Sequence, residues 1–188
     1  MKIDKEFKGL VKEDFRYVFN GDIETAECLE VDLDMELFVT GSIEAGGSII
    51  ASWSIEAGGY IEANWSIEAG GFIKAGWYIE AGGFIKAGWY IEAGGSIIAS
   101  KYIEAGGYII AGWDIEAGGL FGIVAGLSIT CKGTLSFGLK AFAGICSWKE
   151  VTEEEKTIAC GKLEGGVIEY GILKETGIEE NVQSEMIK

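Results

Sequence analysis

The stretch "WYIEAGGFIKAGWYIEAGG", residues 77–95, reads almost the same twice and contains the repeat that decides the fold. Its unit is a hexapeptide: Trp or Gly, a variable residue, Ile, a second variable residue, Ala, and a small residue. Trp and Gly alternate at the first position here, so two hexapeptides make a twelve-residue unit. Copies of this unit follow one another over residues 41–119. Short repeats of fixed period indicate a stacked, repetitive architecture.

The spacing inside each hexapeptide is that of a β-strand. Ile and Ala stand two residues apart, as do the first residue and the Ile. A period of two is the strand period, and a Gly in every unit argues against a helix. We therefore expect short strands with small-residue corners. Trp, Ile and Ala should share one face, while the Ser or aromatic residue and the Glu should share the other.

An open sheet of such strands would leave its Ile and Ala face uncovered, because the chain has no long apolar helix to pack on it. Coiling lets the strands enclose their own interior. The sequence thus predicts an all-β, short-coil β-solenoid (β-helix) of 6/12-residue repeats. The alternative is a β-meander closed as a barrel or packed face to face in a dimer. The predicted architecture is similar to left-handed hexapeptide helices, but their motif is absent.

The number of hexapeptides per coil sets which side chains stack. We predict two, because five Trp residues would then form one column with Gly opposite, filling a narrow interior evenly. These residues are Trp53, Trp65, Trp77, Trp89 and Trp113. Three per coil is the alternative, and it would alternate Trp over Gly down each column.

The 188 residues fit one domain in three parts. Residues 1–20 are predicted to cap the solenoid as an amphipathic helix, although 16–20 fit a strand equally well. The solenoid is expected over 21–147, with its regular core at 41–119; the alternative is that it resumes after 157. Residues 148–188 are predicted to form a C-terminal cap with strands and a short helix, because Thr152 and Glu155 have the capping-box spacing.

The composition argues against an enzyme. The chain has no His, which removes the commonest general base and metal ligand, and no nucleotide-binding or hydrolase motif is present. We predict no catalytic residue, cofactor or metal. The four cysteines are expected as reduced thiols, and a zinc site at Cys131, Cys146 and Cys160 has only weak spacing support. Without a signal peptide or membrane span in the sequence, we expect a soluble cytoplasmic protein.

The charge and the aromatic residues suggest two surfaces. The net charge is −15, and glutamates recur every twelve residues. In a two-strand coil they would form an acidic column: Glu44, Glu56, Glu68, Glu80, Glu92, Glu104 and Glu116. An apolar face is expected on the opposite side, where it would form a partner or homodimer contact. It would comprise Tyr60, Phe72, Phe84, Tyr108, Ile98 and Ile110.

These surfaces lead to two functional hypotheses. The first is a non-catalytic acidic binding protein, a decoy or inhibitor that mimics nucleic acid and engages a basic, nucleic-acid-handling partner. The analogy is with small acidic inhibitors encoded by phages and mobile elements. The second is a structural, self-assembling scaffold, similar to bactofilins only in being a short-repeat solenoid. Direct binding of nucleic acid is disfavoured by the acidic charge.

Overall fold

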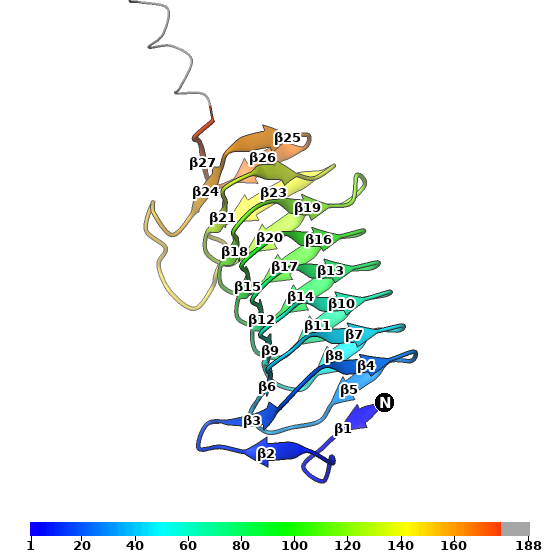
Figure 1. Ribbon diagram of the computed structural model, residues 1–188. Helices are drawn as coiled ribbons and strands as arrows, with labels where there is room; N and C mark the ends of the chain where they lie inside the picture. Colours follow the sequence, from blue (N-terminus) through cyan, green and yellow to red (C-terminus); the bar gives the residue numbers. More distant parts are fainter. Residues whose placement is uncertain (178–188) are drawn as a thin grey trace, which may run out of the picture.

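The computed structural model describes residues 1–177 and shows a β-solenoid, as predicted (Figure 1). Twenty-seven short strands stack in three sheets, and residues 1–177 contain no helix. Consequently no helix in this part of the chain is long and apolar enough to cross a membrane. The interior lies between the three sheets, which run along the whole rod.

The three sheets, named A, B and C here, each take one strand from every complete coil, and sheet B has the hairpin strand β2 in addition. In spatial order, sheet A contains β1 (Lys2–Ile3), β5 (Leu29–Val31), β8 (Ile49–Ala51), β11 (Ile67–Ala69), β14 (Ile85–Ala87), β17 (Ile103–Ala105), β20 (Ile123–Ala125), β23 (Lys140–Ala143) and β26 (Val167–Tyr170). Sheet B contains β2 (Leu10–Lys12), β3 (Arg16–Phe19), β6 (Glu36–Val39), β9 (Ile55–Ala57), β12 (Ile73–Ala75), β15 (Ile91–Ala93), β18 (Ile109–Ala111), β21 (Ile129–Cys131), β24 (Thr157–Cys160) and β27 (Ile172–Glu175). Sheet C contains β25 (Lys162–Glu164), β22 (Thr134–Ser136), β19 (Ile115–Ala117), β16 (Ile97–Ala99), β13 (Ile79–Ala81), β10 (Ile61–Ala63), β7 (Ile43–Ala45) and β4 (Ile23–Thr25).

The strand register corrects the predicted coil length. Ile61 pairs with Ile43 on one side and Ile79 on the other, in parallel, so a coil holds three hexapeptides and not two. No residue from 41 to 119 has a positive φ. Tight strand reversals usually require positive φ, so these corners are built for the gentler turns of a three-sided coil.

The core is formed by the Ile and Ala of each hexapeptide, as the strand period predicted. Ile79 is fully buried and Ala81 is 1% exposed, while Glu80 between them is exposed. The tryptophans were expected inside, and this was wrong: Trp65 and Trp113 are each 69% exposed. Only three residues of each hexapeptide are in the strand, so the first residue lies at a corner, where the alternation of faces no longer applies.

The N-terminal cap is a hairpin and not the predicted amphipathic helix. Strands β2 and β3 pair antiparallel, with Leu10 opposite Phe19. The Phe7 and Phe19 rings lie 5.9 Å apart, and both residues pack against the end of the core. The same apolar residues therefore cover the first coil, but β3 gains hydrogen bonds to β6 that a helix would not provide.

The C-terminal part contains the predicted strands but no short helix up to residue 177. The capping-box bonds do form: the Thr152 amide donates to Glu155 Oε2 (3.1 Å), and the Glu155 amide donates to Thr152 Oγ1 (3.3 Å). They close a turn in a loop that leaves the rod between β23 and β24 (Figure 1). Strands β24 to β27 then rejoin the sheets, so the solenoid continues past the predicted boundary at 147. The rest of this predicted cap, residues 178–188, lies outside the described residues.

Candidate interaction surface

The predicted acidic column is divided among the three sheets, because the coil is eighteen residues long and the glutamates recur every twelve. Three of its seven members lie on sheet C, two on sheet B and two on sheet A. The members are Glu44, Glu80 and Glu116 on sheet C, Glu56 and Glu92 on sheet B, and Glu68 and Glu104 on sheet A. No single face therefore carries the column as it was predicted.

A different acidic row forms on sheet C, and we call it the acidic ladder. Its main run is Glu24, Glu44, Glu62 and Glu80, each paired in register with the next. Ile98 follows, and Glu116 continues the row. Neighbouring rungs are about 4.8 Å apart. Sequence reasoning missed Glu24 and Glu62, although an eighteen-residue spacing would have found Glu62.

The other two sheets each carry a lysine that pairs with one of their glutamates. On sheet B, the Lys74 ammonium lies 3.3 Å from the Glu56 carboxylate, and on sheet A, Lys86 lies 3.2 Å from Glu104. In residues 1–177, no Lys or Arg side chain forms an ion pair with a glutamate of the acidic ladder. Sheet C therefore carries a run of four glutamates in register with no ion pair to any of them.

Two tyrosines support the acidic ladder. The Tyr60 hydroxyl donates to Glu44 Oε2 at 3.2 Å, and the Tyr78 hydroxyl donates to Glu62 Oε2 at 2.9 Å. Their rings stack with centroids 4.9 Å apart and planes 3° apart. Burial raises the pKa of Tyr78, and the bond to Glu62 raises it further, so the hydroxyl remains a donor. These contacts hold both carboxylates in fixed positions.

The predicted apolar face is also divided among the sheets. Tyr60 and Ile98 belong to the side of sheet C, Phe84 to sheet A, and Phe72, Tyr108 and Ile110 to sheet B. The aromatic residues form separate stacks, with centroids 4.8 Å apart for Phe72 and Tyr90 and 5.0 Å apart for Phe84 and Tyr102. These rings are half-buried against one another. The six residues therefore do not share one face, and the homodimer contact stays a prediction.

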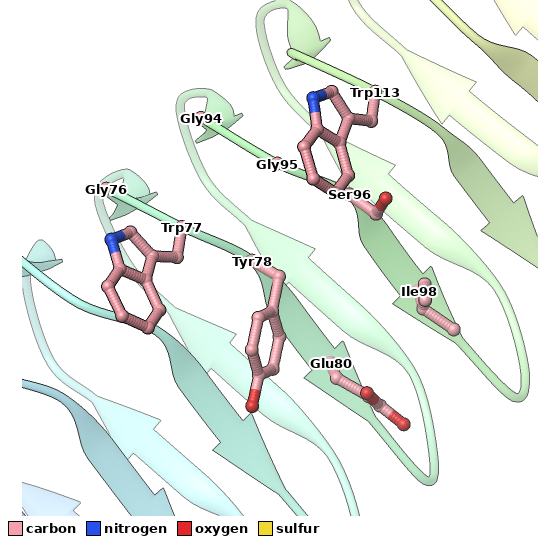
Figure 2. Close-up of a pocket in the computed structure, with 9 residues that line it drawn as sticks. All are labelled: Gly76, Trp77, Tyr78, Glu80, Gly94, Gly95, Ser96, Ile98 and Trp113. Carbon is pink, nitrogen blue, oxygen red and sulfur yellow. The ribbon is translucent and has the colours of Figure 1, made fainter.

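The exposed apolar surface is instead formed by tryptophans at the corners. At two of the three corners Trp recurs after an intermediate coil that carries Gly, as in Trp77, Gly95 and Trp113. At the third corner, Lys101 stands where Trp65 would be repeated. Figure 2 shows both indoles beside the chain where it enters sheet C. A pocket of about 540 Å³ lies between them, bordered by Tyr78 and Glu80. The apolar corner and the acidic ladder therefore meet at one place.

The cysteines do not assemble the weakly supported zinc site. Cys131 and Cys160 are buried in the core of β21 and β24, whereas Cys146 lies in the loop between β23 and β24. Burial raises the pKa of Cys131 to about 12, so this thiol is protonated at neutral pH. Among residues 1–177, no three His, Cys, Asp or Glu side chains are placed to hold a metal ion.

No protein-family model, curated protein or solved structure matches this chain. The class of the protein therefore comes from its own architecture. It is a three-sided β-solenoid with an acidic ladder on one sheet and exposed tryptophans at its corners.

Proposed function

We propose that the protein is a non-catalytic binding protein that presents sheet C to a basic surface of another protein. The observation that carries this proposal is the placement of lysine. Lys74 and Lys86 stand between glutamates on sheets B and A, while the run from Glu24 to Glu80 contains no cation. The fold thus leaves an unbroken run of four glutamates on sheet C, whereas a lysine interrupts the row of glutamates on each of the other two sheets.

The energetics of the acidic ladder favour binding over a purely structural role. Like charges in register across neighbouring strands destabilise a sheet, although solvent and salt reduce the cost at the surface. A partner's lysines and arginines would remove this repulsion on association. The face is rigid, because the carboxylates lie on core strands and two of them accept tyrosine hydrogen bonds. Little entropy is lost in ordering such a surface.

The partner that fits this face is a basic, nucleic-acid-handling protein, for which the solenoid would act as a decoy. Rungs about 4.8 Å apart do not match the phosphates of one DNA strand, which recur every 3.4 Å or so of helix axis. The mimicry is therefore of negative potential and not of atomic positions. Four free cysteines fit a reducing compartment such as the cytoplasm.

Displacement of DNA from a basic protein tests this proposal. Fluorescein-labelled duplex DNA is bound to protamine, and the solenoid is added while the fluorescence anisotropy is followed. We expect the DNA to be released, and release to weaken as salt is raised. The variant E24Q/E44Q/E62Q should need roughly threefold or more protein for the same release.

A charge-matched variant serves as the control. E6Q/E150Q/E153Q removes three exposed glutamates outside the acidic ladder and has the same net charge as the ladder variant. It should release DNA as the wild type does. Equal loss in both triple variants would show that only net charge matters and would refute a specific acidic face.

A self-assembling scaffold is the second candidate, and the last coil favours it. Up to residue 177, β25, β26 and β27 are the final strands of their sheets at this end, and Val167 and Tyr170 on β26 are 58% and 49% exposed. Open edges of this kind pair with other chains. Sedimentation velocity should then show concentration-dependent assembly that V167K abolishes. A wild-type protein that stays monomeric at high concentration would exclude this candidate.

A further inference from the structure

The pocket between Trp77 and Trp113 has an unusual combination of walls. The two indoles stand at its sides, and the backbone at Gly95 forms the floor between them (Figure 2). Tyr78 and Ile98 add apolar surface, and Glu80 is its only charged lining residue. Trp77 is 65% exposed and Trp113 is 69% exposed, so both rings are accessible from solvent.

The pocket exists because the tyrosine stack and the run of glutamates stop at the same coil. The Tyr60–Tyr78 stack would continue at the position of Ser96, whose small side chain leaves space beside the Tyr78 ring. The run of glutamates stops at Glu80, because its neighbour on the next coil is Ile98. Glu80 therefore has a glutamate on only one side, and its carboxylate borders an apolar hollow.

Two comparable places on the rod show what is particular about this one. Trp53 and Trp89 have the same two-coil spacing, but their rings are in contact, with centroids 6.0 Å apart. A second pocket, of about 510 Å³, lies between Trp89 and Trp148 and has no charged lining residue. The Trp77–Trp113 pocket thus combines open aromatic surfaces with a carboxylate, which neither of the other places does.

These walls are suited to an organic cation. The faces of Trp and Tyr attract a cation placed over them, and a carboxylate adds an ion pair. The apolar walls can pack against the methylene stem of a long basic side chain. Arginine fits better than lysine, because its guanidinium is planar, stacks on aromatic rings and is more weakly hydrated.

We propose that this pocket binds an arginine side chain of the basic partner, held between Trp77 and Trp113 with its guanidinium paired to Glu80. This inference rests on the proposed function, since the acidic ladder would bring the basic partner to sheet C. The ladder supplies long-range attraction, and the pocket supplies the preference for arginine at one fixed position.

Two fluorescein-labelled peptides test the proposal by anisotropy: hexalysine, and the same peptide with one central lysine replaced by arginine. The wild type should bind the arginine peptide roughly 3- to 10-fold more tightly than hexalysine. W77A, W113A and E80Q should each reduce the ratio of the two affinities towards 1. W53A, which removes an exposed indole at a corner without this pocket, should keep the wild-type preference.

A filling variant tests the same site without removing an aromatic or charged wall. S96Y continues the Tyr60–Tyr78 stack into the pocket, in a position where Tyr78 already fits one coil earlier. It should lose the arginine preference while its thermal midpoint stays at or above that of the wild type. Retention of the preference in S96Y, W77A and W113A would overturn the pocket assignment.

The outcomes separate this inference from the proposed function. If both peptides bind the wild type equally well, and E24Q/E44Q/E62Q weakens both, the pocket assignment fails while the acidic binding face stands. If neither peptide binds the wild type at low salt, the binding face fails and the pocket assignment fails with it.

Discussion

The indole rings of Trp53 and Trp89 are in edge-to-face contact, with centroids 6.0 Å apart, although a complete coil lies between them. Gly71 occupies the same corner on that intermediate coil, so no side chain separates the two rings. The two residue numbers differ by 36, which is two coils of eighteen and three repeats of twelve. The mismatch between repeat and coil therefore distributes the Trp residues of the repeat over all three corners, and no two successive coils carry Trp at the same corner.

The Trp53–Trp89 contact should contribute measurable stability. An aromatic pair is worth about 0.5–1.5 kcal/mol beyond its buried area. We expect W53A and W89A each to destabilise the protein modestly and the double variant to lose less than the sum. A double-mutant cycle from guanidinium unfolding measures this coupling. Strict additivity would mean that the rings contribute separately.

Two neighbouring isoleucines test the strand alternation. Ile49 is fully buried in the core, whereas Ile50, on the same strand, is 50% exposed. Ile49→Ala should lower the free energy of unfolding by about 2–5 kcal/mol, because it leaves a cavity in a packed interior. Ile50→Ala should lower it by less than about 1 kcal/mol. Similar losses in urea unfolding would contradict the assignment of inner and outer faces.

Glu36 should make the stability depend on pH near neutrality. The pKa of Glu36 is raised from 4.5 to about 7, mainly by burial and also by the neighbouring Glu56, against the lowering effect of Arg16 and Lys74. The folded state binds the proton of the Glu36 carboxyl more tightly than the unfolded chain does. The stabilisation from this proton is therefore complete below about pH 4.5 and is lost as the pH rises through about 7.

The variant E36Q isolates this effect. It should be more stable than the wild type at pH 8, and the difference should shrink as the pH is lowered to 5. Urea unfolding of both proteins over this range measures the difference. A difference that is the same at pH 5 and pH 8 would show that Glu36 titrates normally in the fold.

Tyr90 should weaken the fold at high pH. Burial raises the pKa of Tyr90 to about 12, with a further contribution from Tyr108, whose ring stacks on it at 4.7 Å. The unfolded chain ionises this tyrosine near pH 10, so stability should fall as the pH rises from about 10 to 12. Y90F keeps the stack, and its thermal midpoint should fall less steeply than that of the wild type over this pH range. Identical slopes for the two proteins would argue against this origin.

Much of the local structure follows from short-range patterns. Ile and Ala at a spacing of two predicted strands with a buried Ile/Ala face, and burial of Ile79 and Ala81 confirms it. The Thr152–Glu155 spacing predicted a capping box, and its two hydrogen bonds are present, although the turn does not continue as a helix. The apolar residues around Phe7 were identified as a cap, but their conformation depends on pairing with β3 and β6, which is not a local property.

The sequence by itself determined that each six-residue repeat contains a short strand with an inner and an outer face, because that alternation depends only on neighbouring residues. Only the tertiary structure decided how many strands close a coil, because every hexapeptide offers the same backbone hydrogen bonds and any multiple of six preserves the inner face. The structure has three, and its corners turn without positive φ between residues 41 and 119. That choice alone placed Glu62 beside Glu44 and Glu80, and set Trp77 and Trp113 on either side of Gly95.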